Sequence, residues 1–117
     1  MIKEKSVLVD TNEAEWQPVE LPNLPSGAFM KLLKINEGTG SLTALVKFPA
    51  GFVEPRHSHS VGHMVYVIEN ELGSGNSAYG EGTYWYAPAN DIHGPVEQTN
   101  DCIFLLITDG PLDFKLK

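Results

Sequence analysis

Short apolar runs separated by clusters of glycine, proline and asparagine form the pattern of this chain. Residues 42–48 carry an apolar side chain at every even-numbered position, which is the period-2 alternation of a strand with one buried face. Residues 29–35 form a second apolar run, and the polar sequence NEGTGS between the two is typical of a short connection. The pattern therefore predicts a β-hairpin over residues 29–48.

Four further runs predict strands. Residues 64–68 are apolar throughout, so we expect one face of that strand to pack on the core and the other on a second sheet or a second subunit. Residues 83–86 should send Trp85 to one face and two tyrosines to the other. Residues 102–108 predict a central strand, and the shorter run Ser6 to Val9 predicts an edge strand.

Helical periodicity is absent over any useful length, and three prolines within residues 18–25 require an extended, irregular segment there. Several short strands at regular spacing, divided by turn residues, indicate an antiparallel sandwich or barrel. A length of 117 residues is enough to bury a core without staples. We therefore expect one all-β domain over residues 1–117.

The amino-acid composition excludes some classes of binding partner. A formal net charge of −7 argues against nucleic acid and against anionic membranes, because both require clustered lysine and arginine. Small molecules are the expected ligands. The one cysteine, Cys102, allows no intrachain disulfide and reads as a buried hydrophobe, and neither a signal peptide nor a membrane-length apolar run is present. These features predict a cytoplasmic protein.

All four histidines lie in two pieces, GFVEPRHSHSVGH and YAPANDIHGP. His57 and His59 are two residues apart, so both imidazoles project from the same face of an extended strand, and His63 keeps that parity. His93 can be brought alongside by a hairpin that runs from Met64 through a glycine-rich turn to the strand at residues 83–86. The four side chains should therefore converge.

An isolated histidine on a strand is most often a surface residue or a hydrogen-bonded core residue. A cluster of buried imidazoles without metal would need a separate hydrogen-bond partner for each ring, and the rings would repel one another when protonated. Neutral imidazoles aimed at one point bind divalent transition metals well. We therefore predict one divalent metal ion per chain (Fe, Zn, Ni, Cu or Mn) on His57, His59, His63 and His93.

The other ionisable residues give weaker signals, and no catalytic residue is identified. Arg56 should point away from His57. The acidic residues show no pairing of the kind that glycosidases use and are interpreted as solvated, with a contact from Glu97 to an imidazole as a minor alternative. The acidic residues concerned are Glu54, Glu69, Glu71, Glu81 and Glu97.

The histidine pattern resembles the two motifs of the cupin superfamily. Gly51 is followed after five residues by His57, then by His59 and His63, and Gly82 is followed after five residues by Pro88 and then by His93. The chain departs from the family pattern at four places. It has His63 where a glutamate is usual, Asn70 and Asn90 where glycine is usual, and Glu97 where asparagine is usual.

The resemblance spans nearly the whole chain and is greatest to small cupins related to the ChrR sensor domain and to acetylacetone-cleaving dioxygenases. It implies a jelly-roll barrel, a four-histidine metal site inside one mouth of the barrel, and a homodimer. It also implies a metal-dependent dioxygenase that acts on a small carbonyl or diketone-like compound. The alternatives are a non-catalytic sensor module similar to the ChrR cupin domain and a purely structural metal. We expect a free-standing domain without a fused anti-sigma segment, which favours the enzyme.

Overall fold

Six strands form the larger sheet of the molecule, for which a computed structural model describes residues 4–74 and 76–117. Every neighbouring pair in this sheet is antiparallel. The sheet order is β1 (Gln17–Pro18), β2 (Phe29–Ile35), β3 (Leu42–Phe48), β11 (Cys102–Thr108), β6 (His63–Glu69) and β9 (Tyr84–Ala87).

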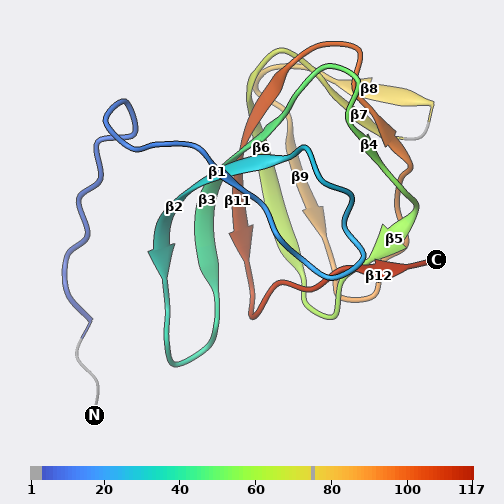
Figure 1. Cartoon of the computed structure of the whole chain (residues 1–117). Helices are drawn as coiled ribbons and strands as arrows, with labels where there is room; N and C mark the ends of the chain where they lie inside the picture. The colour runs from blue at the N-terminus through green and yellow to red at the C-terminus, as the bar shows by residue number, and fades with distance from the viewer. Residues whose placement is uncertain (1–3, 75) are drawn as a thin grey trace.

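Three pairs of short strands lie opposite the larger sheet and close the other side of the barrel (Figure 1). They are β4 (Val53–Glu54) with β10 (Val96–Glu97), β5 (His57–Ser58) with β12 (Lys115–Leu116), and β7 (Leu72–Ser74) with β8 (Ser77–Tyr79). The residues described contain no helix, and hence none long and apolar enough to cross a membrane. The predicted all-β class is confirmed.

The core lies between the two layers and follows the alternation read from the sequence. Ala44, Val46 and Phe48 of β3 are buried, as are Phe104 and Leu106 of the neighbouring β11. The predicted hairpin is present, with β2 antiparallel to β3, and the predicted central strand is β11, between β3 and β6. Period-2 alternation was therefore sufficient to identify the inner face of the larger sheet.

Residues in the left-handed backbone region explain two departures from the cupin pattern. Gly51 and Gly82 each have φ of 87°, and Asn70 and Asn90 have φ of 60° and 66°. Asparagine is the residue that adopts this region most readily after glycine, because its short polar side chain can hydrogen-bond locally. The asparagines therefore keep the backbone turns that glycine usually provides at these positions.

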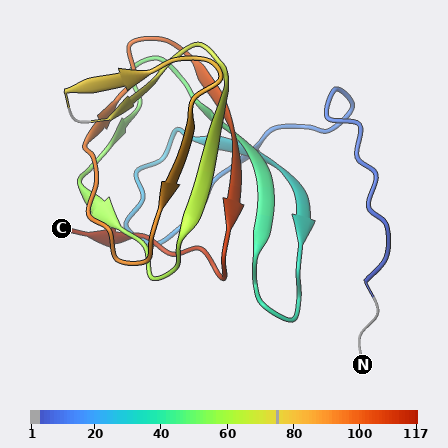
Figure 2. The ribbon, with the colours of Figure 1, turned by 180° about the vertical axis from the view of Figure 1, so that it is seen from behind.

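Two predicted features of the outer surface differ from the structure. Ser6 to Val9 forms no strand, and Leu8 is 99% exposed. Figure 2 shows this N-terminal segment standing apart from the barrel. A short apolar run becomes a strand only when an edge pairs with it, and β1 occupies the start of the edge of β2.

The second difference concerns the outer face of β6. Val65 and Val67 are buried, but Tyr66 and Ile68 are each 42% exposed, so the expectation of a strand covered on both faces is wrong for the chain alone. The alternation at residues 84–86 is as predicted, because Trp85 packs against the core while the two tyrosines are exposed. The exposed side chains of β6 and β9 lie on the same outer face.

Candidate metal centre

Backbone pairing, rather than sequence proximity, brings the histidine pieces together. β6 and β9 pair in antiparallel register, and the chain leaves β9 through a turn at residues 88–91, where the Asp91 amide donates to the Pro88 carbonyl at 3.2 Å. His93 then forms an isolated β-bridge with His57, in which each backbone amide donates to the other residue's carbonyl at 2.9 Å. The predicted arrival of His93 beside the HxH segment is confirmed.

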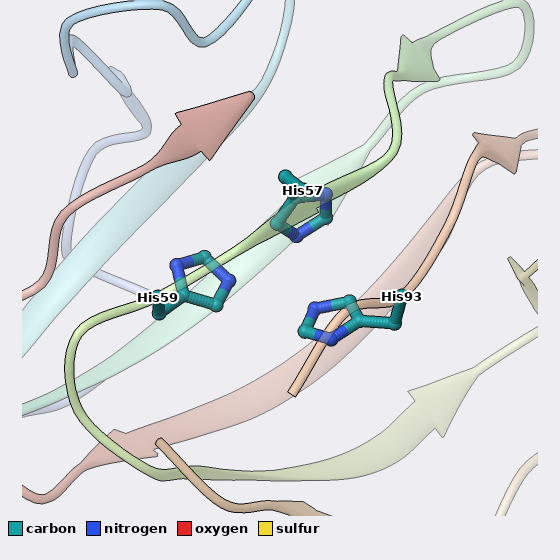
Figure 3. Close-up of side chains that lie close together, drawn as sticks. All are labelled: His57, His59 and His93. Atoms are coloured by element: carbon teal, nitrogen blue, oxygen red, sulfur yellow. The ribbon is translucent and has the colours of Figure 1, made fainter. Parts of the chain in front are cut away.

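The imidazole rings gather on the inner side of this bridge. One ligand nitrogen from each of His57, His59 and His93 can be chosen so that all three atoms lie within 4.8 Å of one another. Figure 3 shows His57 and His59 on one segment and His93 facing them from the neighbouring segment. His63 is next to this group rather than within it, with its ring centroid 4.7 Å from that of His59 and 5.6 Å from that of His93.

Hydrogen bonds to backbone carbonyls orient two of these rings. The Nδ1 atom of His57 donates to the Pro55 carbonyl at 2.6 Å, and the Nδ1 atom of His59 donates to the Asp113 carbonyl. Each bond leaves the Nε2 atom with a free lone pair, which is the arrangement that outer hydrogen bonds impose on metal-binding histidines. Phe114 stacks on the ring of His57 with a centroid separation of 4.3 Å and holds it in place.

Several imidazole nitrogens are buried without a partner among the residues described: Nε2 of His57, Nδ1 of His63 and Nδ1 of His93. A buried polar atom without a hydrogen bond costs about 1–3 kcal/mol, so three in one cluster call for a common explanation. A divalent transition metal supplies it, because it accepts lone pairs from several neutral imidazoles at once. The donor set therefore fits a metal ion.

Burial keeps these rings neutral. Burial, together with the neighbouring histidines, lowers the pKa of His57 to about 4 and that of His63 to about 3. Burial also lowers the pKa values of His59 and His93. All four rings are thus unprotonated at neutral pH, in the form that binds metal.

A cavity of about 70 Å³ opens beside the four histidines. Its walls are mostly apolar and include Phe48, Trp85, Phe104 and Phe114. A small molecule within it would be held against the imidazole cluster by apolar contacts and shielded from bulk water. The structure therefore combines a polar cluster with a compact hydrophobic chamber.

Sequence reasoning missed Glu54, which lines the same cavity and was interpreted as solvated. Its Oε1 atom lies 3.5 Å from Nε2 of His57, and its side chain is only 13% exposed. Glu97, the carboxylate given as the minor alternative, is exposed on β10. The signal in the sequence was Pro55: it separates β4 from β5, so strand parity counted back from His57 does not apply to Glu54.

Replacing Glu54 with glutamine should stabilise the metal-free protein at pH 8. Burial raises the pKa of Glu54 from 4.5 to about 8, so the folded state keeps a proton that the unfolded state releases. The stabilisation from this proton is complete below pH 4.5 and is lost as pH rises through 8. Melting temperatures in chelator should therefore be higher for E54Q than for wild type at pH 8, with a difference that shrinks toward pH 5.

The exposed Glu97→Gln on the paired strand β10 is the matched control and should behave as wild type. A higher melting temperature for wild type than for E54Q at pH 8 in chelator would show that burial of the ionised carboxylate does not destabilise the folded protein.

The family described as the ChrR cupin-like domain matches residues 4–113. A curated relative, the DNA damage-repair/toleration protein DRT102 of Arabidopsis thaliana, is 34% identical over 108 residues. That match covers 87% of this chain but only 32% of the relative, so this chain spans about a third of the relative's length.

Solved structures share the fold. A proposed acetylacetone dioxygenase from Methylibium petroleiphilum superimposes with a TM-score of 0.81 at 24% identity, over 96% of this chain and 82% of the other. The complex of Rhodobacter sphaeroides SigE with the anti-sigma protein ChrR matches with a TM-score of 0.65 at 23% identity, over 86% of this chain and 51% of the other. At these identities the likeness concerns the fold alone.

Proposed function

Because this chain belongs to the ChrR cupin-like family, we propose that it is a metal-dependent dioxygenase that acts on a small carbonyl or diketone-like compound. One divalent transition metal per chain would be held by His57, His59, His63 and His93. The jelly-roll fold expected from the two histidine motifs is confirmed by the family match and by the solved structures. The dioxygenase reaction and the four histidine ligands of the metal are proposed.

The observation that carries the proposal is the position of the imidazole cluster at the wall of an apolar cavity. The histidines whose buried nitrogens have no hydrogen-bond partner, His57, His63 and His93, line a cavity of about 70 Å³. A metal that only stabilised the barrel would not require such a chamber, since structural sites are closed by protein ligands. The arrangement therefore supports a metal ion that binds a small molecule in the cavity.

A divalent metal bound there would act as a Lewis acid on a carbonyl oxygen and, as iron, would add oxygen chemistry. The protein's own contribution is positioning. The carbonyls of Pro55 and Asp113 fix the ring orientations of His57 and His59, and the aromatic walls receive the alkyl groups of the substrate and exclude water. A compact diketone would bind the metal through its oxygens, and its alkyl groups would contact the aromatic walls.

We expect the protein loaded with Fe(II) to bind acetylacetone under anaerobic conditions with a new visible absorption band, because the chelated diketone would replace water at the metal. Admission of air should then consume oxygen and bleach the band. The measurement is an anaerobic titration followed by oxygen uptake, with metal-free protein as the control.

A protein that holds one iron per chain but gives no spectral change with acetylacetone or related chelating carbonyls would contradict the dioxygenase. The alternative function would then be a non-catalytic metal-binding or ligand-binding sensor module. The fold shared with the anti-sigma protein ChrR supports that alternative.

Three expectations from the sequence accompany this proposal. A homodimer would cover Tyr66 and Ile68 on the outer face of β6, which the chain alone leaves partly exposed. A cytoplasmic location and a one-domain organisation are likewise proposed. Sedimentation analysis of the purified protein tests the first, with Tyr66→Lys expected to favour the monomer.

A further inference from the structure

We propose that Glu54 is a carboxylate ligand of this metal centre, adjacent to His57. The inference rests on the proposed metal site and deepens it, because it changes the charge of the site and the metals that it would prefer. The cupin pattern usually places a glutamate where this chain has His63. Here a carboxylate would reach the ion from a different strand, β4.

The distance between Glu54 and His57 is slightly longer than the spacing of two ligands of one ion. Oε1 of Glu54 and Nε2 of His57 are 3.5 Å apart. Two neighbouring donors, each about 2.1 Å from a metal, are separated by roughly 3.0–3.4 Å in octahedral or tetrahedral geometry. Nε2 is also the His57 nitrogen that no hydrogen bond occupies. The carboxylate therefore flanks the atom through which His57 would bind metal.

The backbone fixes this approach from both sides. Glu54 pairs with Val96 in the β4–β10 ladder, and the carbonyl of the next residue, Pro55, accepts the hydrogen bond from His57 Nδ1. The same short segment thus orients the imidazole and delivers the carboxylate. Glu54 is outside the set of three histidines whose nitrogens lie within 4.8 Å of one another, so its side chain would have to rotate toward His59 and His93 to share one ion with all three.

Glu54 has no positive partner in the part of the chain that the structure describes. Its side chain is 13% exposed and forms no ion pair with lysine or arginine among the residues described. Enclosing an ionised carboxylate in an apolar cavity is unfavourable unless a cation accompanies it, and without a cation the carboxyl group keeps its proton. A divalent ion on the histidines would be that cation, and Glu54 would lower the net charge of the occupied site from +2 to +1.

The test compares the metal affinities of wild type and Glu54→Gln by competition with a chelating dye. We expect E54Q to bind Mn²⁺ more weakly by about 10- to 100-fold. The loss for Zn²⁺ should be smaller, because carboxylate oxygen favours Mn²⁺ whereas imidazole suits Zn²⁺ well. Glu97→Gln, which removes an exposed carboxylate from the strand paired with β4, is the matched control and should change neither affinity.

A spectroscopic readout separates ligation from a general effect on the fold. The visible spectrum of bound Co²⁺ depends on its donors, so it should differ between E54Q and wild type and remain the same for E97Q. Should E54Q fail to fold, Glu54→Asp serves instead. Its shorter side chain withdraws the carboxylate, so the same weakening of Mn²⁺ binding and a shifted Co²⁺ spectrum are expected.

Equal Mn²⁺ affinities and identical Co²⁺ spectra in wild type and the Glu54 variant would overturn the assignment of Glu54. That result would leave the histidine site standing. Wild-type protein that holds none of these metals would instead overturn the proposed function, so the two failures are distinguishable.

Discussion

Replacing His93 with alanine is expected to lower the metal content of the protein from about one ion per chain to a small fraction. His93 faces His57 and His59 from a neighbouring segment, so its loss removes the donor opposite those two histidines. Even residues that only orient a ligand account for about 10- to 100-fold in metal affinity, and loss of a ligand should cost at least as much. Elemental analysis after dialysis against a weak chelator measures the effect.

The backbone bridge between residues 57 and 93 does not use the imidazole, so H93A should keep the fold. Ile92→Ala is the matched control, because Ile92 precedes His93 and is 47% exposed. Circular dichroism should be the same for both variants and wild type. Undiminished metal stoichiometry in H93A would remove this residue from the ligand set.

Acid is expected to destabilise the metal-free protein below pH 6.5. Burial lowers the pKa of His57 to about 4 and that of His63 to about 3, whereas the unfolded chain takes up these protons near 6.5. Depressed values in the folded state mean that the stabilisation is present above pH 6.5 and is lost as pH falls toward 4 and 3. Glu54 has the opposite effect, because its pKa is raised to about 8 and the stability of the folded state therefore increases as pH falls below 8. The melting temperature should therefore be highest near pH 6.5.

The stabilisation by added metal should persist to lower pH. Protons compete with metal for a folded imidazole only near its folded pKa, which is about 4 for His57 and is lowered below 6.5 for the other three histidines. The gap between melts with and without Zn²⁺ should therefore still be present below pH 6.5 and close as pH approaches 4. Differential scanning calorimetry across pH 4 to 8 gives both curves. A metal-free melting temperature that does not change between pH 6.5 and 5 would contradict the burial of neutral imidazoles.

The spacing of the histidines was readable because a strand has a simple period. His57 and His59 are two positions apart, which puts both rings on one side wherever the chain is extended. His93 could be placed from local signals, since a hairpin and a turn at Pro88 leave few other paths for the chain. The left-handed turns at Asn70 and Asn90 were likewise compatible with the residues present.

Contacts between distant segments could not be read in this way. Strand propensity at Ser6 to Val9 predicted a strand, but no edge pairs with that segment. Whether Tyr66 is covered depends on what lies over the outer face of the sheet, and nothing in the local pattern of residues 64–68 encodes that. Propensity describes the residue, whereas pairing and burial describe its surroundings.

Sequence alone determined the all-β class, the principal strands and the convergence of the histidines, because each follows from alternation and from turn residues close to the site. Only the tertiary structure decided that Glu54 enters the same cavity. Pro55 breaks the strand between Glu54 and His57, and β10 and Phe114 then enclose the segment from distant parts of the chain. The environment of that carboxylate is set by long-range packing, which has no period along the sequence.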